Sequence, residues 1–118
     1  MCGINGHFGL EQIPNPQDVL HRMNERIAHR GPDASGVKTF DKVCLGHLRL
    51  SIIDLSSGAD QPMTDASGRY TMVFNGEVYN FREIKDQLVD YPFKTQSDTE
   101  VLLAAYAQWG PAALQLFN

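Results

Sequence analysis

Residues 36–50, GVKTFDKVCLGHLRL, contain two short runs of strand-forming residues separated by the polar pair Asp41-Lys42. The runs, 37–40 and 43–48, carry the β-branched, aromatic and other apolar side chains that favour strands. A short polar connection between two such runs is typical of a turn between neighbouring strands. The stretch therefore predicts two strands that turn at Asp41-Lys42, and the apolar character continues over residues 50–55.

A strand and a helix are predicted before this pair. Residues 3–9 combine small and alternating side chains in the manner of a short strand. The helix begins at Asn15-Pro16, an N-cap followed by a proline at the first helical position. It is expected to end at Arg30-Gly31, a cation followed by a C′ glycine. Between these ends, apolar residues recur at helical spacing, at Val19, Leu20, Met23 and Ile27.

Turn-forming residues in the middle of the chain predict a hairpin. Residues 65–68, DASG, lie between two extended runs and lead into a strand over 69–75. Large apolar side chains alternate with others along that run, so both of its faces are expected to be covered. Residues 91–96, YPFKTQ, predict a further brief strand.

Two capping patterns predict helices in the C-terminal part. Asn80 with Glu83 resembles a capping box for a helix from 81 to about 89. The SDTE sequence at 97–100 repeats the pattern for a helix that Gly110-Pro111 ends, and another short helix begins at the proline. The helices lie between groups of strands, which favours a mainly antiparallel α+β layered fold over a doubly wound one. With 118 residues the chain is about one domain.

Composition excludes several classes of function. Hydrophobic residues are 42% and charged residues 20% of the chain, as in ordinary globular proteins. The net charge of −4 and the scattered cations argue against nucleic-acid binding. No apolar run is long enough for a membrane span and no secretory leader is recognisable, so we expect a cytoplasmic protein without a membrane partner. In that compartment Cys2 and Cys44 are expected to be free thiols, and Cys44 a core residue.

Five motifs occur along the chain: MCG at 1–3, HRGPD at 29–33, HLRLSIID at 47–54, FNGEVYN at 74–80 and SDTE at 97–100. Each alone is weak evidence. In this order and at these separations, with Cys2 as the second residue, they closely resemble the glutamine amidotransferase domain of the asparagine synthetase family. That family is a class II amidotransferase with an N-terminal nucleophile, and the resemblance covers the whole chain.

The resemblance implies a four-layer αββα N-terminal-nucleophile hydrolase sandwich of mainly antiparallel sheets, incomplete at the C-terminus. Residues 1–118 would be part of a glutamine amidotransferase type 2 domain, without the synthetase domain. The implied activity is hydrolysis of glutamine to glutamate and ammonia, which supplies nitrogen for ATP-dependent conversion of aspartate to asparagine in the parent protein.

The resemblance also implies L-glutamine and the C-terminal synthetase domain as partners, with ATP and Mg bound by that absent domain and no cofactor in this segment. A homodimer is left open. Two alternatives remain: an amidotransferase for another acceptor, such as a surface-sugar or peptide precursor, and a non-catalytic fragment that binds glutamine or a partner.

Cys2 is the candidate nucleophile, since a thiolate can form a thioester with the glutamine amide and so divide one difficult step into two easier ones. Removal of Met1 would leave the thiol and a free α-amine on the same residue. The pKa of such an α-amine is about 7.7–8.0, so the amine can serve as the general base. Judged alone, Cys2 is more simply a small buried residue; the other motifs favour the catalytic interpretation.

Asn75 and Gly76 are the candidate oxyanion donors, through a carboxamide and a closely approaching backbone N–H. The alternative is that Asn-Gly is simply a turn. For glutamine itself, Arg49 offers a planar fork to the α-carboxylate, and Asp98 or Glu77 a countercharge to the α-ammonium. The resemblance adds the backbone of Leu50, Ser51, Ile52 and Ile53 to this binding site.

Simpler roles remain open for two of these charged residues: Arg49 in a surface ion pair and Asp98 as a helix N-cap. Arg30 and Asp33 of HRGPD are interpreted as structural residues that tie a loop near the nucleophile. The four histidines and two cysteines lack metal-ligand spacing, so no metal site is expected.

Overall fold

A computed structural model of the chain describes residues 1–9 and 13–118, which divide into two compact units. Unit 1 consists of Met1–Ser51, Asp60–Pro62 and Val73–Gly76, and unit 2 of Ile52–Ala59, Met63–Met72 and Glu77–Asn118. The chain therefore passes between the units several times. None of the helices in the described ranges is long and apolar enough to cross a membrane.

Unit 1 is built on an antiparallel sheet of β1 (Gly3–Phe8), β2 (Ala34–Thr39) and β3 (Val43–Arg49) in the order β1-β3-β2. The two strands predicted within residues 36–50 are confirmed, although β2 begins earlier than expected, at Ala34. The first predicted strand is also confirmed. Register places Gly3 and Ala34 opposite Leu48 and Arg49, so Cys2 and the end of β3 share one end of the sheet.

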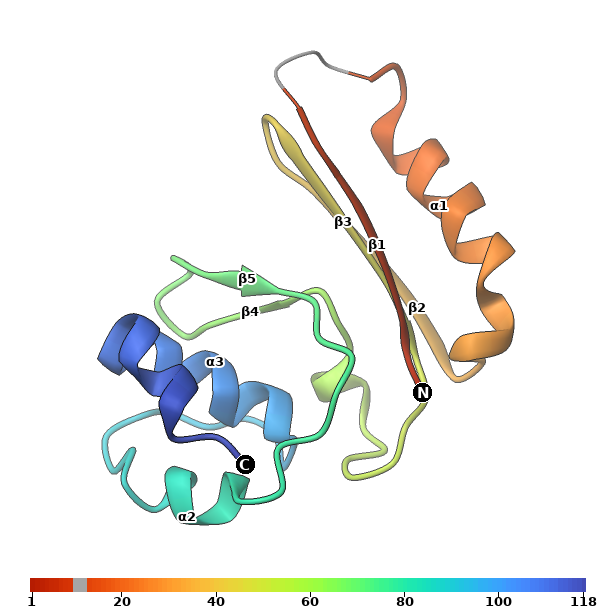
Figure 1. The fold of residues 1–118 in the computed structure, drawn as a ribbon. Coiled ribbons are helices and arrows are strands. Elements are labelled where there is room, and N and C mark those ends of the chain that lie inside the picture. The colour runs from red at the N-terminus through yellow and green to blue at the C-terminus, as the bar shows by residue number, and fades with distance from the viewer. Residues whose placement is uncertain (10–12) are drawn as a thin grey trace. The chain divides into compact units, whose positions relative to one another are not determined.

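Helix α1 (Pro16–Arg26) lies along one face of this sheet and contacts all three strands (Figure 1). Its buried Asn24 joins the layers: Nδ2 donates to Ser35 Oγ at 2.9 Å and to the Gly36 carbonyl at 3.3 Å, and Oδ1 accepts from Asn5. Ile4 and Phe8 alternate with Asn5 along β1, so they lie on the opposite face, where they are 49% and 78% exposed. One face of the sheet is thus covered by α1, and the other leaves part of β1 exposed.

The prediction that the first helix continues to Arg30-Gly31 is wrong. The α-helix ends at Arg26, and residues Ala28–Arg30 form a 3-10 turn. Here the backbone N–H groups of Ile27, Arg30 and Gly31 bond carbonyls three residues back, the pattern of a 3-10 helix. Gly31 then passes closely against β3, where a Cβ would lie 2.4 Å from the carbonyl carbon and oxygen of Leu48.

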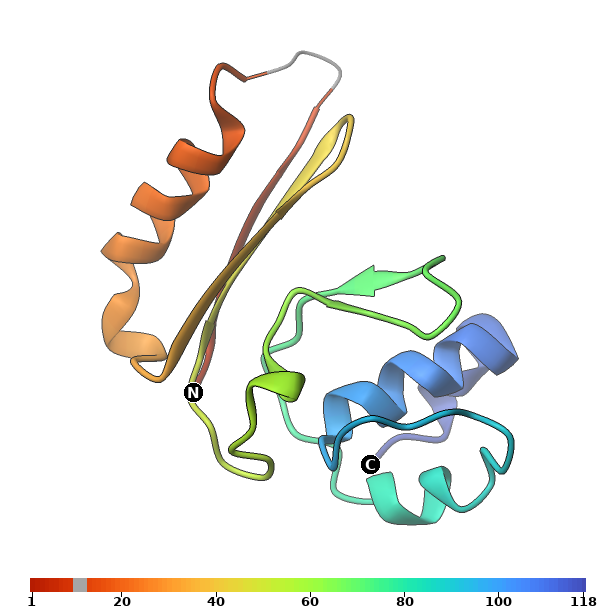
Figure 2. The same ribbon diagram turned by 180° about the vertical axis from the view of Figure 1, so that it is seen from behind.

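Unit 2 contains the short hairpin of β4 (Met63–Thr64) and β5 (Thr71–Met72), followed by helices α2 (Phe81–Lys85) and α3 (Asp98–Trp109). The elements are seen from the other side in Figure 2. Asp65 closes the hairpin by accepting from the N–H groups of Ser67 and Tyr70. The predicted turn is confirmed, but the strand over 69–75 is reduced to two residues.

Helix α3 forms the core of unit 2. Its residues 98–105 are all buried, and Leu103 packs with Ala59 and Met63 against Tyr70 and Met72. Ser97 caps the helix as predicted, since its hydroxyl accepts from the Glu100 N–H at 3.2 Å. After α3, the short helix predicted at Pro111 is present as a 3-10 helix, Gly110–Gln115.

Three predictions in unit 2 are wrong. Residues 91–96 form no strand, because the N–H groups of Lys94 and Thr95 donate to the buried Glu100 carboxylate and not to a partner strand. Helix α2 ends at Lys85, well before residue 89. The Asn80 side chain forms no cap, because it bonds the Leu116 carbonyl and the Asn118 N–H.

Candidate functional site

The predicted nucleophile lies at the end of the sheet in unit 1. Cys2 directly precedes β1 and is half-buried. Its Sγ accepts a weak hydrogen bond from the Leu50 N–H at 3.4 Å and lies 3.8 Å from the Leu50 carbonyl oxygen. The thiol is therefore held against the backbone that continues from β3.

The HRGPD loop contacts the same end of the sheet. Arg30 Nε donates to the Cys2 carbonyl at 3.3 Å. Asp33 accepts from the Ser51 N–H at 2.7 Å, and its own N–H donates to the Arg49 carbonyl. The loop thus has hydrogen bonds both to the thiol-bearing residue and to the segment that follows β3.

Arg49 is the last residue of β3 and is buried, with only 7% of its surface exposed. Its Nη1 donates to Asp60 Oδ1 at 2.8 Å, in an ion pair within unit 1. The ion pair of the structural alternative is therefore present, although it joins a buried arginine to an Asp60 side chain that is 39% exposed. Asp60 was not predicted from the sequence, and no motif indicated it.

Asn75 and Gly76 belong to unit 1, directly after Phe74. Neither has the positive φ that a type I′ turn requires, so this Asn-Gly pair is not an ordinary hairpin turn. A Cβ on residue 76 would lie 2.6 Å from the Phe74 ring, so glycine lets the chain fold back over that ring. Gly76 itself is an exposed residue.

The Phe74 backbone is bonded on both sides by side chains that sequence reasoning missed. Its N–H donates to Gln61 Oε1 at 2.6 Å, and its carbonyl lies 3.2 Å from His47 Nε2. His47 is 1% exposed, and desolvation by burial lowers its pKa below the ordinary value of 6.5. The spacing of His47 and Arg49, two residues apart on one strand, was a usable signal that they share a face.

Unit 2 contains the remaining predicted site residues. Ile52, Ile53 and Glu77 are exposed, whereas Asp98 is buried. Asp98 Oδ2 accepts from the Val78 N–H at 2.9 Å, which brings it beside the residue that follows Glu77. The N-cap alternative for Asp98 is wrong, because Ser97 is the N-cap and Asp98 the first helical residue.

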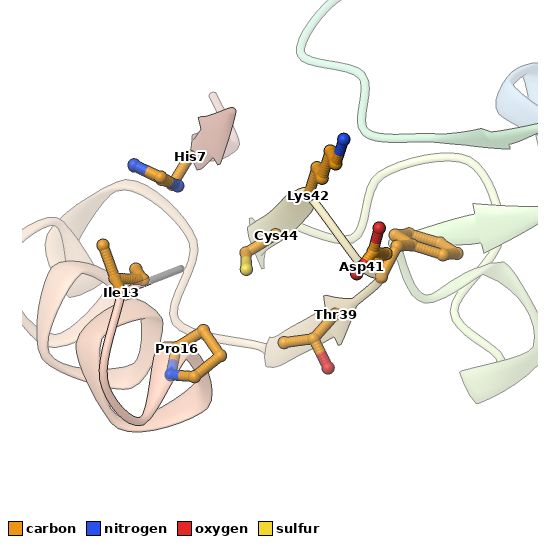
Figure 3. A pocket seen from close by; sticks show the side chains of 8 residues that line it. His7, Ile13, Pro16, Thr39, Asp41, Lys42 and Cys44 are labelled. Carbon is orange, nitrogen blue, oxygen red and sulfur yellow. The ribbon is translucent and has the colours of Figure 1, made fainter. Parts of the chain in front are cut away.

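A separate open pocket of about 240 Å³ lies at the opposite end of the sheet in unit 1 (Figure 3). It contains none of the predicted site residues. Among its lining residues are His7 and Cys44, which face each other across β1 and β3, with Pro16 of α1 nearby. Cys44 is 5% exposed and both cysteines are free thiols, as predicted. Within residues 1–9 and 13–118, no three His, Cys, Asp or Glu side chains group as metal ligands do.

Comparison with known proteins yields close relatives. Glutamine-hydrolysing asparagine synthetase 1 of Bacillus subtilis is 42% identical over 92% of this chain. Asparagine synthetase 1 of Saccharomyces cerevisiae is 38% identical over 90% of it, and Amidase chry2 of Gibberella zeae 41% identical over 93%. The chain spans 18% of the length of each of these three proteins.

The family described as "Glutamine amidotransferase domain" matches residues 1–118. This match includes the half-buried thiol at the end of β1, the buried arginine at the end of β3 and the Asn-Gly pair after Phe74. The chain therefore belongs to the family of glutamine amidotransferase domains.

Proposed function

We propose that this chain hydrolyses L-glutamine to glutamate and ammonia with Cys2 as the nucleophile. The observation that carries the proposal is the position of the Cys2 thiol, which is half-buried, held by the Leu50 N–H and located at the end of the sheet where β3 ends in Arg49. Membership of the amidotransferase family supplies the substrate class.

In the proposed reaction Cys2 Sγ attacks the side-chain amide carbon of glutamine and forms a tetrahedral intermediate. The Asn75 carboxamide and the Gly76 N–H donate to its oxyanion. The C–N bond then breaks, ammonia leaves with the proton from the thiol, and a γ-glutamyl thioester remains on Cys2. Water hydrolyses the thioester, which releases glutamate and restores the thiol.

Recognition of the amino-acid end of glutamine is assigned to charged groups. Arg49, with Leu50 and Ser51 beside it, would bind the α-carboxylate, and Asp98 or Glu77 the α-ammonium. Burial of Arg49 strengthens such an interaction, because charge pairs are screened less away from water. Arg30 and Asp33 would hold the nucleophile's segment in place through their bonds to Cys2 and Ser51.

The base is proposed to be the α-amine of Cys2 after removal of Met1. Met1 is 74% exposed, so the bond to be cleaved lies at an accessible end of the chain. The freed amine would lie on the same residue as the thiol, and so could take its proton and return it to ammonia.

In the full-length protein the ammonia is proposed to serve ATP-dependent conversion of aspartate to asparagine in the cytoplasm. A synthetase domain that binds ATP and Mg would be the partner of this domain. The names of the bacterial and yeast relatives support this assignment. Residues 1–118 would then be part of a type 2 amidotransferase domain.

We also propose a four-layer αββα arrangement for the complete domain. The antiparallel sheet of unit 1 has one face covered by α1 and exposes Ile4 and Phe8 on the other. Exposed large apolar side chains on an edge strand favour a further layer over that face.

The test is intact mass of the purified protein before and after a diazo-ketone analogue of glutamine. We expect loss of Met1 and one adduct on Cys2, together with release of ammonia from glutamine. Cys2→Ala should abolish both the adduct and the activity, whereas Cys44→Ala, the matched thiol control, should retain them. Full glutaminase activity in Cys2→Ala would refute the proposal.

A further inference from the structure

The backbone of Phe74 is held at both of its polar groups by side chains from other segments of unit 1. Gln61 Oε1 accepts from the Phe74 N–H at 2.6 Å, and His47 Nε2 lies 3.2 Å from the Phe74 carbonyl oxygen. Both side chains belong to buried residues. Among the residues that the structure describes, no strand partner bonds these two groups, so side chains take the place of the sheet ladder directly before Asn75.

Burial favours the neutral form of His47, with its proton on Nε2. A carbonyl oxygen only accepts, so Nε2 of His47 carries the proton and donates to Phe74. Nδ1 is buried and has no hydrogen-bond partner within residues 1–9 and 13–118, and burial lowers the pKa of His47. A second proton on Nδ1 would therefore be a buried donor with no acceptor, and the neutral Nε2–H tautomer is favoured.

The arrangement carries a cost in folding free energy. A buried unpartnered nitrogen is unfavourable, and an apolar side chain of similar volume would avoid that cost. What His47 supplies is one directed N–H at the Phe74 carbonyl. The backbone of Gln61 packs tightly against β2, since its main-chain carbonyl oxygen fills the space where residue 36 would carry a Cβ.

The hydrogen bonds from His47 and Gln61 fix the Phe74 backbone, which directly precedes the proposed oxyanion donors. The Phe74 carbonyl and the Asn75 N–H belong to one planar peptide unit, so fixing the carbonyl direction fixes the plane from which Asn75 extends. Gly76 follows immediately. Catalytic donors lose their effect when they are misplaced by about 1 Å, with a loss on the order of 100-fold.

We propose that His47 and Gln61 are positioning residues for glutamine hydrolysis, which hold the Phe74 backbone so that Asn75 and Gly76 present their donors to the oxyanion. The inference rests on the proposed function. Neither residue touches the reacting atoms. Their substitution is expected to lower kcat and leave KM nearly unchanged, because the donors act on the transition state and not on substrate binding.

The test compares His47→Leu, His47→Gln and Gln61→Met in the full-length protein. His47→Leu removes the N–H, His47→Gln keeps a donor of similar reach, and Gln61→Met keeps the length but removes the acceptor. We expect kcat for glutaminase activity to fall about 10- to 100-fold in His47→Leu and Gln61→Met. KM should change less than about threefold, and His47→Gln should recover most of the loss.

Two controls separate positioning from other causes. His7→Leu removes the histidine of β1 at the other end of the sheet and should leave kcat unchanged. Alkylation of Cys2 by iodoacetamide should proceed at the wild-type rate in every variant, because the thiol itself is unaltered.

The outcomes are distinct. If the wild type releases no more ammonia than Cys2→Ala, the proposed function fails. If the wild type is active but kcat of His47→Leu or of Gln61→Met stays within twofold of it, the positioning role is overturned. It is also overturned if His47→Gln loses as much activity as His47→Leu, or if His47→Leu does not fold and Gln61→Met leaves kcat unchanged.

Discussion

Replacing Gly36 by alanine is expected to displace the segment Asp60–Pro62 and to destabilise unit 1. A Cβ on residue 36 would lie 2.0 Å from the Gln61 carbonyl oxygen, where ordinary contact begins at 3.4 Å. The Gln61 carbonyl carbon at 3.0 Å and Pro62 Cδ at 3.1 Å would also be crowded. Because the obstruction is backbone, a rotamer change of Gln61 cannot relieve it, and the segment itself has to retreat by more than 1 Å.

The magnitude follows from two terms. Gly36 is half-buried, and forcing an extra methyl group into a tightly packed contact costs about 1–3 kcal/mol. Retreat of Gln61 would also weaken its 2.6 Å bond to Phe74, at a cost of about 1 kcal/mol. We expect the free energy of unfolding to fall by about 2–4 kcal/mol and the melting temperature by roughly 10–20 °C.

Urea unfolding and differential scanning calorimetry measure these quantities. Gly58→Ala is the matched control, since its Cβ would crowd only side-chain atoms: the Thr95 methyl group at 3.3 Å, which needs to move by a few tenths of an ångström, and Ser56 Oγ at an ordinary contact distance of 3.5 Å. That variant should stay within about 1 kcal/mol of the wild type. If Gly36→Ala unfolds like the wild type, the close approach of Gln61 to β2 is not a feature of the folded protein.

Other parts of the structure yield further predictions. Leu20→Ala removes a fully buried side chain of α1 and should lower the free energy of unfolding by about 2–5 kcal/mol in urea titrations. Met23→Ala, at a 37% exposed position of the same helix, should lower it by less. Equal losses in the two variants would contradict the packing of α1. Ser97→Ala removes the hydroxyl that accepts from the Glu100 N–H and should cost about 1 kcal/mol by the same measurement, and no change would argue against the cap. Burial lowers the pKa of His47, so the unfolded chain binds a proton at this imidazole more readily than the folded protein does. The contribution of neutral His47 to the free energy of unfolding is therefore complete above pH 6.5 and is lost as the pH falls through the folded pKa. Unfolding at a series of pH values should show a smaller decline in His47→Gln than in the wild type, and equal declines would refute the assignment.

Local patterns in the sequence were sufficient for most of the elements. The strand pair within residues 36–50, the start of the first helix at Pro16 and the Ser97 cap depend on side chains close together in the chain, and the structure confirms them. The order of the five motifs also predicted the family, which the match over residues 1–118 confirms. The catalytic and binding roles of individual residues stay predictions.

Errors arose where a polar group formed a hydrogen bond outside the element predicted for it. Residues 91–96 look like a strand, but the Glu100 carboxylate takes the N–H groups of Lys94 and Thr95. Asn80 looks like a cap, but it bonds the last residues of the chain. Such competition depends on which groups meet in space, and propensity does not contain that information.

The sequence by itself determined most of the element types, the antiparallel class and the motifs of an amidotransferase, because periodicity, turn chemistry and spacing are local properties. Only the tertiary structure decided which partners hold the site together. It brought Asp60 to Arg49, and Gln61 and His47 to Phe74, across 11, 13 and 27 positions of chain. These contacts stabilise buried polar groups that have to find partners once water is excluded, and the partner is whichever group the fold places within reach.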